Sequence, residues 1–249
     1  MTSVHDFGAA GDGKRDDTAA IEHALRDGDG LIEFPRGEYL ITKTIEVRLS
    51  EVGRTAITGS MGLAKIIMKA AGPAFRIVGN HAGTADPASM KPDIWRSQRM
   101  ATIAEIEIEG AHAEADGIEL IGAVQPIVRN VGLHRLRHGV LLTKRNRNVI
   151  IEGCQVYHNT GVGVFLNNVN LHQINIIGNH ISYNRLGGIR IQNSEVRNLQ
   201  ITGNDIEYNN NRSHSIDDEP RTEVYIEYTA ENATVNAPKI ARSTSKAKP

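Results

Sequence analysis

The feature that most constrains this chain is a repeat of 25 residues in its second half. Gly153, Gly178 and Gly203 follow one another at that spacing, and each comes at the end of a short aliphatic and polar run. A second limb keeps the same spacing, from Ile181-Ser182-Tyr183-Asn184 to Ile206-Glu207-Tyr208-Asn209, and a third limb follows it. Three short alternating segments per repeat, separated by Gly and Asn, predict a solenoid of parallel strands.

Alternation within the third limb assigns its two sides, because successive side chains of a strand point in opposite directions. The residues expected to stack inside the solenoid are Ile118, Val140, Val164, Ile189 and Val224, with Leu120, Leu142, Leu166, Ile191 and Ile226. The expected outward columns are Glu119, Leu141, Phe165, Arg190 and Tyr225, with Ile121, Thr143, Asn167, Gln192 and Glu227 beside them. Thin aliphatic layers of this kind fit a chain with only 4% aromatic residues.

Two polar residue types recur with the repeat. Asn179 and Asn204 are expected at turns, where an asparagine side chain can bond to nearby backbone. Tyr157, Tyr183 and Tyr208 are expected to form a structural stack across successive coils.

The opening segment predicts a tight glycine-rich loop followed by a short helix. The apolar positions Ile21, Ala24 and Leu25 fall on one helix face, Asp16 or Asp17 can cap its start, and Gly28-Asp29-Gly30 ends it. Such a helix would cover one end of a solenoid.

The same segment fits most of a phosphate-binding loop, from Gly8 to Lys14. Arg15 stands where that motif needs Ser or Thr, and the neighbouring aspartates would repel a phosphate. Nucleotide binding is therefore not expected.

The run Val4-His5-Asp6-Phe7-Gly8-Ala9-Ala10-Gly11-Asp12-Gly13, followed by Asp16-Asp17-Thr18-Ala19-Ala20-Ile21, resembles the N-terminal signature of the pectate-lyase-like proteins of the rhamnogalacturonase/epimerase type. The resemblance implies an all-β fold, a right-handed parallel β-helix with a short N-terminal capping helix. It also implies a polysaccharide as the substrate class, without naming a reaction.

The organisation expected from these patterns is one β-helix domain with two inserts. We assign residues 1–236 to the domain, 1–30 to its N-terminal cap, 79–100 and 210–221 to loop inserts, and 237–249 to a flexible tail. Inserts on a rigid scaffold are where binding is usually found, and the first holds Trp95, the single Trp. No cap is apparent after the last coil, so that edge is expected to be covered by a partner, for example in a homotrimer, or by residues absent from this sequence.

Composition narrows the partners and the location. A net charge of −1 gives no reason to expect nucleic acid, and no apolar run is long enough for a membrane span. The single Cys154 excludes an internal disulfide framework. Relatives of this type are often exported, so the resemblance implies a secreted, cell-surface or virion protein. Between Gly122 and Ser194 there are eight Lys or Arg and one acid, a distribution that could attract an anionic chain.

Hydrolysis, epimerisation and elimination all fit the resemblance, but the sequence lacks the catalytic segments that the first two reactions use in related enzymes. Hydrolysis needs two carboxyls across the sugar bond, but the Asn-Thr-Asp, Asp-pair and Gly-His-Gly segments of polygalacturonases are absent from the coils. Asp217-Asp218 is the one acidic pair in a plausible loop. The Tyr-Gly-Phe-Asp-Pro-His segment of mannuronan epimerases aligns with residues 138–143, where Leu141 and Thr143 replace its catalytic Asp and His.

Elimination from a uronate needs a cation for the carboxylate and groups that move a proton, and the basic stretch supplies both. We take His138, Lys144 and Arg190 as candidate catalytic residues. Candidate substrate contacts are Arg137, Tyr157, His158, Arg185 and Trp95. No metal or cofactor is expected, because the central coils have almost no acids and the pair His134 and His138 does not fall on a helix. The leading hypothesis is a polysaccharide lyase; a glycoside hydrolase and a non-catalytic glycan-binding protein of the tailspike or adhesin kind stay open.

Overall fold

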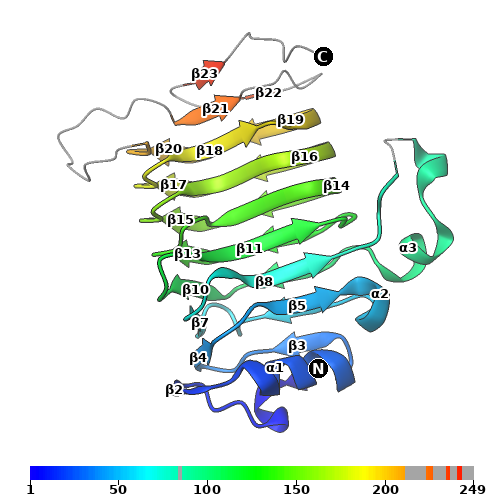
Figure 1. The fold of residues 1–249 in the computed structure, drawn as a ribbon, viewed down its shortest axis with the longest axis vertical. Coiled ribbons are helices and arrows are strands. Elements are labelled where there is room, and N and C mark those ends of the chain that lie inside the picture. Colours follow the sequence, from blue (N-terminus) through cyan, green and yellow to red (C-terminus); the bar gives the residue numbers. More distant parts are fainter. Residues whose placement is uncertain (84–85, 211–222, 227–233, 236–239, 243–249) are drawn as a thin grey trace.

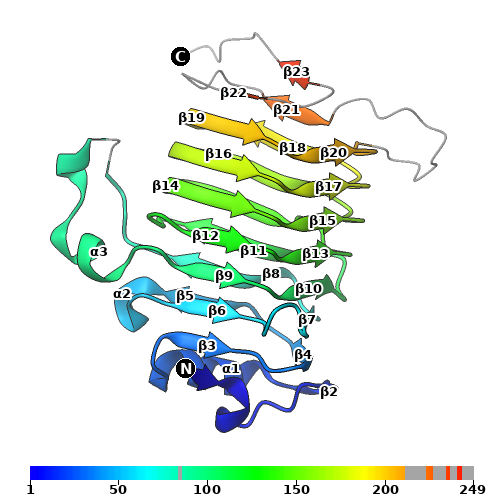
Figure 2. The ribbon, with the colours of Figure 1, turned by 180° about the vertical axis from the view of Figure 1, so that it is seen from behind.

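The computed structural model describes residues 1–83, 86–210, 223–226, 234–235 and 240–242. They form a right-handed parallel β-helix whose coils stack along one axis, with the N-terminal helix at one end (Figures 1 and 2). Each full coil contributes to three faces, numbered here in chain order. The predicted fold class is confirmed.

All strand pairs in the described residues are parallel, and most coils place one strand on each face. Face 1 contains β5 (Ile45–Arg48), β8 (Gly72–Val78), β11 (Ala115–Ile121), the first parts of β14 (Val140–Glu152) and β16 (Val162–Ile177), β18 (Gly187–Gln192), β21 (Val224–Ile226) and β23 (Ile240–Arg242). Face 2 contains β1 (Thr2–Ser3), β3 (Leu31–Glu33), β6 (Ala56–Thr58), β9 (Thr102–Ala104), β12 (Ile127–Arg129), the later parts of β14 and β16, β19 (Glu195–Thr202) and β22 (Thr234–Val235). Face 3 contains β2 (Asp12–Asp16), β4 (Gly37–Ile41), β7 (Ala64–Met68), β10 (Glu107–Gly110), β13 (Gly132–His134), β15 (Gln155–Tyr157), β17 (His180–Ser182) and β20 (Asp205–Glu207).

The inward columns stack as the alternation predicts. Val164 pairs with Ile189 across β16 and β18, and the neighbouring rungs keep that register. The residues of the first predicted column, Ile118, Val140, Val164, Ile189 and Val224, are each 0% exposed. Burying one such side chain contributes about 1.5–3 kcal/mol. Stacked aliphatic rungs therefore form one continuous core.

Asparagines occupy the interior of the corners between faces. At the corner between faces 2 and 3, Asn179 accepts from the backbone of Cys154, and its own Nδ2 donates to Asn204. At the corner between faces 3 and 1, a second stack joins Asn159, Asn184 and Asn209, and their amides also bond to the backbone of the coil before. The predicted turn role of Asn179 and Asn204 is confirmed.

The tyrosine stack differs from the prediction by one residue. Tyr157 pairs in register with Ser182, so its column is not that of Tyr183. Tyr183 instead stacks between His158 and Tyr208, with ring centroids 5.0 and 5.3 Å away. Tyr157 stacks on His134 of the coil below at 5.2 Å. The prediction was wrong because it matched residues by type and not by position after the repeat glycine.

The N-terminal end is closed by the predicted helix. The 3-10 turn η1 (Val4–Phe7) and α1 (Thr18–Asp27) pack together over the first coils, and α1 buries Ile21, Ala24 and Leu25. Asp17 stands at the start of α1, but its carboxylate accepts from the backbone of Ala10 and Gly11 in place of the helix.

The first insert leaves the corner between faces 1 and 2 and carries η2 (Pro87–Ser89) and α3 (Pro92–Ser97) (Figure 1). A short helix, α2 (Leu49–Val52), lies at the same corner one coil earlier. The second predicted insert, 210–221, lies outside the described residues except for Asn210. Of the predicted tail, only β23 is described, and it pairs with β21.

Candidate functional site

The sequence-predicted residues lie on three separate surfaces. Arg137, His138 and Arg190 come together where the chain enters face 1. Tyr157 and His158 lie on face 3. The other candidates are further away: Lys144 lies at the corner between faces 1 and 2, Trp95 on α3 of the insert, and Arg185 in the turn between β17 and β18.

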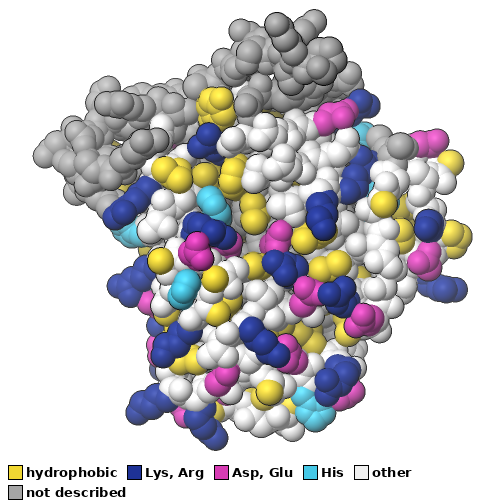
Figure 3. Space-filling model, in the orientation of Figure 1, with side chains coloured by type: hydrophobic (Ala, Val, Ile, Leu, Met, Phe, Trp, Pro, Cys, Tyr) yellow, Lys and Arg dark blue, Asp and Glu magenta, His cyan; other side chains and the backbone are white. Residues whose placement is uncertain are grey.

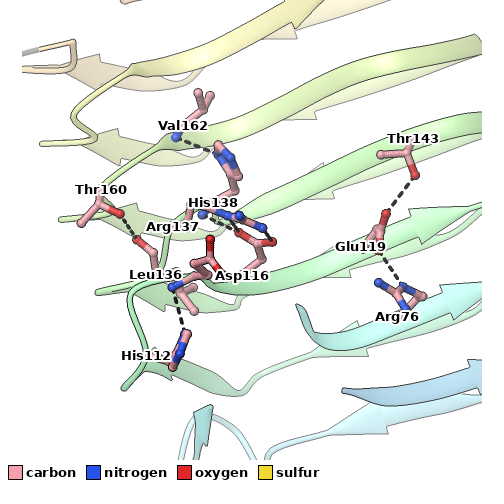
Figure 4. Close-up of polar contacts among 11 residues, drawn as sticks. Arg76, His112, Asp116, Glu119, Leu136, Arg137, His138, Thr143, Thr160 and Val162 are labelled. Carbon is pink, nitrogen blue, oxygen red and sulfur yellow. Dashed lines mark hydrogen bonds and ion pairs between the residues drawn. The ribbon is translucent and has the colours of Figure 1, made fainter. Parts of the chain in front are cut away.

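The entry to face 1 is organised around a buried carboxylate. Asp116 is 2% exposed and accepts a bidentate pair from Arg137, at 2.9 Å from Nε and 2.6 Å from Nη2 (Figure 4). The backbone N–H of His138 donates to the same carboxylate at 3.1 Å. The pKa of Arg137 is raised, first by its hydrogen bond to Asp116. Asp116 therefore fixes the positions of Arg137 and His138 as their ion-paired acceptor.

His138 is held as a neutral ring in one tautomer. The backbone N–H of Val162 donates to its Nδ1 at 3.0 Å, so the ring proton sits on Nε2 (Figure 4). Burial, as the largest cause, lowers the pKa of His138, and Arg137 and Arg190 contribute in the same direction. A Cβ at Gly161 would lie 2.7 Å from the ring, so only glycine permits this approach. The side chain thus presents an N–H donor and not the free base expected from the sequence.

An outward column continues from His138 across successive coils. The His138 ring lies 5.0 Å from the ring of Phe165, which pairs in register with Arg190, and Arg190 pairs in register with Tyr225. The Arg190 guanidinium lies over the Tyr225 ring at 5.3 Å, and its Nε is buried without a hydrogen-bond partner in the described part of the chain. A cation between two aromatic rings is a surface that suits an acidic sugar ring.

The outward carboxylates of Glu119 and Glu46 on face 1 form hydrogen bonds and ion pairs with neighbouring side chains. Glu119, expected to be outward, is covered to 8% exposure, because Arg76 Nε donates to it at 2.6 Å and Thr143 Oγ1 at 3.0 Å (Figure 4). Arg76 also pairs with Glu46. Figure 3 shows charges of both signs interleaved over this face. Among the described residues of face 1, no pair of carboxyls is therefore available for acid and base roles.

Face 3 carries an open groove of about 550 Å³ with an aromatic wall. Its lining includes Glu107, Gly132, Gln155, Tyr157, His158, His180, Ser182 and Tyr183. Burial, with Glu107 and Glu109 adding to it, raises the pKa of Tyr157.

Two groups on this face have the donor set for a metal. They are Glu107, Glu109 and His134, and His180, Asp205 and Glu207, each with ligand atoms within 4.8 Å of one another. In the first group, Lys65 and Arg135 already neutralise Glu109. In the second, Asp205 and Ser182 occupy the two nitrogens of His180. The expectation of no metal stays a prediction.

Face 2 carries a groove of about 650 Å³ that the sequence reasoning missed. Its walls are mainly carboxamides, from Gln125, Asn148, Gln173, Asn175, Asn198 and Gln200, with Arg99 and Met100 at one end. The Arg99 guanidinium lies over the ring of Trp95 at 4.3 Å, and that ring is half exposed. The signal in the sequence was the 25-residue recurrence of Asn148, Gln173 and Asn198, which is a column of outward amides.

Comparison with known proteins identifies one family. The model of the family described as "Rhamnogalacturonase A/epimerase, pectate lyase-like" matches residues 1–237. No curated protein matches the chain. None of the described helices is long and apolar enough to cross a bilayer.

Similar solved structures share the fold at low identity. A Geobacillus virus E2 protein, ORF18, has a TM-score of 0.53 and 17% identity over 94% of this chain and 50% of its own. The chain therefore spans about half the length of that viral protein. PfbA, a Streptococcus pneumoniae surface adhesin, has a TM-score of 0.49 and 13% identity, covering 98% and 72% of the two chains. The A-module of an Azotobacter vinelandii mannuronan C-5 epimerase has a TM-score of 0.39 and 19% identity, covering 98% and 87%.

Proposed function

The chain belongs to the rhamnogalacturonase A/epimerase, pectate lyase-like family, and from this membership we propose that it acts on an acidic polysaccharide by a lyase-type β-elimination at face 1. The observation that carries the proposal is Arg190. Its guanidinium lies over Tyr225, its neighbour in register is Phe165, and its Nε has no partner among the described residues. Buried donors without partners are rare in folded proteins, so a ligand oxygen is the natural acceptor here.

In the proposed reaction the C5 proton of a uronate leaves, the C4–O bond breaks and a C4=C5 double bond forms. The electron pair left at C5 moves into the C6 carboxylate, so positive charge held at that carboxylate lowers the barrier. Arg190 supplies this charge. The Nε2–H of His138, on the other side of Phe165 from Arg190, donates to another acidic group of the bound polymer. Tyr225, which pairs in register with Arg190 on the next coil, first releases its phenolic proton to solvent, and its phenolate then accepts the C5 proton. The departing oxygen takes a proton from solvent.

The other candidate residues take supporting roles in this proposal. Arg137 positions His138 through their shared contact with Asp116. Lys144 lies three residues beyond Leu141, which shares the outward column of Phe165 and Arg190 and lies two coils before Arg190. It would contact the carboxylate of a neighbouring sugar.

Arg185 precedes β18 and would contact the chain near its entry to face 1. Trp95, Tyr157 and His158 lie on other faces, so we assign them to remote parts of a long substrate. An extracellular or virion location goes with a polymeric substrate of this kind.

The test is turnover of a panel of uronate polymers, followed by ultraviolet absorbance for unsaturated ends and by reducing sugar. We expect unsaturated ends, a loss of about 100-fold or more in kcat/KM for Arg190→Ala, and loss of turnover with retained binding for Tyr225→Phe. Gln192→Ala is the matched control, because Gln192 points outward from the same strand. Reducing ends without unsaturation would replace the lyase with a hydrolase. Wild-type turnover by Arg190→Ala would remove face 1 as the site.

A glycan-binding protein without catalysis is the second candidate. The observation that favours it is the engagement of the face 1 carboxylates Asp116 and Glu119 in ion pairs. It predicts binding to an acidic glycan with no new ends of either kind, and in that case Arg190→Ala weakens binding alone.

A further inference from the structure

The amide groove on face 2 is built as a periodic surface. Asn148 and Gln173 form one outward column, and Asn175 pairs in register with Gln200 in the next. The two columns rise by one coil, about 4.8 Å, at each step. A carboxamide donates and accepts at the same time, which matches the hydroxyl groups of a sugar chain.

A basic column borders this groove on one side. Arg147 pairs in register with His172, and His172 with Arg197, one residue before each amide of the first column. Arg145 lies two residues earlier on the same side of its strand, and its Nη1 donates to Asn170. Two carboxyl-bearing residues lie nearby. Glu195 is paired with Arg197, and Asp86 accepts from Arg147 through its backbone carbonyl.

Buried polar atoms without a partner gather at this corner between faces 1 and 2. Of the eight buried side-chain N and O atoms that lack a partner in the described part of the chain, seven lie here. They are Nδ1 and Nε2 of His81, Nε of Arg99, Oε1 of Gln125, Nε and Nη2 of Arg145, and Nδ1 of His172. His81 is 2% exposed, and burial together with Arg145 and Arg147 lowers its pKa. The corner therefore combines several arginines with buried polar atoms that have no partner among the described residues.

We propose that face 2 is a second glycan-binding site, separate from face 1, which takes an acidic polysaccharide along the helix axis. The hydroxyls of the glycan lie on the amide columns, and its acidic groups lie against Arg147, His172 and Arg197. Arg99 and Met100 close one end of the groove beneath the insert that carries Trp95. The inference rests on the proposed substrate class and not on the proposed reaction. A site of this kind would hold a polymer while face 1 acts on another part of it.

The binding test uses an oligogalacturonate, its methyl ester and inorganic sulfate as calorimetric probes. Arg197→Ala should weaken oligogalacturonate binding roughly fivefold, and the double variant Asn175→Ala with Gln200→Ala should weaken it further. Arg129→Ala is the matched control, because Arg129 is an exposed cation on β12 outside the groove. The methyl ester should bind more weakly than the acid. Equal affinities for acid and ester, or wild-type affinity in both groove variants, would overturn the proposal.

Three further outcomes distinguish a glycan site from a free-anion site, and binding at face 2 from turnover at face 1. Sulfate that binds as tightly as the oligogalacturonate, and equally well to the double amide variant, would mean a free-anion site and overturn the glycan proposal. Burial lowers the pKa of His172, with Arg147, Arg145 and Arg197 adding to it, so a bound acid should move its NMR titration to higher pH. Arg190→Ala should lower turnover about 100-fold, and the further loss of binding that Arg197→Ala causes should persist in the Arg190→Ala background. Binding measured by calorimetry remains a test even if no uronate polymer is cleaved.

Discussion

Replacement of Asn184 tests how the coils are held in register. Asn184 is 0% exposed and lies in the middle of the asparagine stack between β17 and β18. Its side chain accepts from Asn159 Nδ2 at 2.8 Å, and its Nδ2 donates to the Val156 carbonyl at 3.0 Å and to Asn209 Oδ1 at 2.9 Å. Asn184→Ala removes all three bonds and leaves the Val156 carbonyl without that donor.

The expected cost follows from those bonds. Each net hydrogen bond contributes about 1 kcal/mol, and a buried group left without its partner adds more. The free energy of unfolding should therefore fall by about 3–4 kcal/mol, measured as a lower urea midpoint with an unchanged slope. Amide hydrogen exchange should report the loss first in β15, β17 and β18.

The control is Gln192→Ala, an outward residue of the neighbouring strand β18, which should change stability by less than about 0.5 kcal/mol. A loss below about 1 kcal/mol for Asn184→Ala would refute the reasoning. The aliphatic rungs alone would then set the register, and the amide stack would add nothing measurable.

Three further predictions concern buried groups. Arg137→Ala leaves the carboxylate of Asp116 buried without its bidentate partner, so the free energy of unfolding should fall by about 2 kcal/mol in thermal unfolding. This loss is smaller than for a fully buried pair because Arg137 is 40% exposed. An unchanged midpoint would contradict a stabilising role for the pair. Burial raises the pKa of Cys154 to about 11, so a thiol reagent at neutral pH should label it only after unfolding, and labelling of the folded protein would disprove this. The pKa of His81 and of His138 is lowered from 6.5, mainly by burial. The unfolded chain therefore binds more protons below pH 6.5, and urea midpoints should fall as the pH decreases from there and stay level above it.

The fold could be predicted from the pattern within one repeat, because each coil of a solenoid has the same pattern as the coil before it. Aliphatic residues at 25-residue spacing fix which side chains stack, and Val164 and Ile189 are neighbours as expected. The tyrosine column failed because one residue of offset moves a side chain to another column. His158, and not Tyr157, occupies the position of Tyr183.

The candidate site could be predicted only in part. The coils bring Arg137, His138 and Arg190 to the same end of face 1, with Phe165 between His138 and Arg190, but they do not bring Lys144 or Trp95 there. The sequence could not show this, because distance around a coil is not visible in a list of cationic and aromatic residues. The state of His138 depends on the backbone N–H of Val162, which lies on the next coil. No residue pattern near His138 shows that contact.

The amino-acid sequence by itself determined the coil, its aliphatic spine and the helix that closes its first end, since these depend on period and alternation within one repeat. Only the tertiary structure decided which outward groups remain available. Asp116 and Glu119 form ion pairs with Arg137 and Arg76. Arg190 and the corner around His81 have buried polar atoms without a partner among the described residues. The physical reason is that an outward side chain pairs with side chains of the neighbouring coils. Those partners lie about 25 positions away in the sequence, so the local pattern around a residue does not show them.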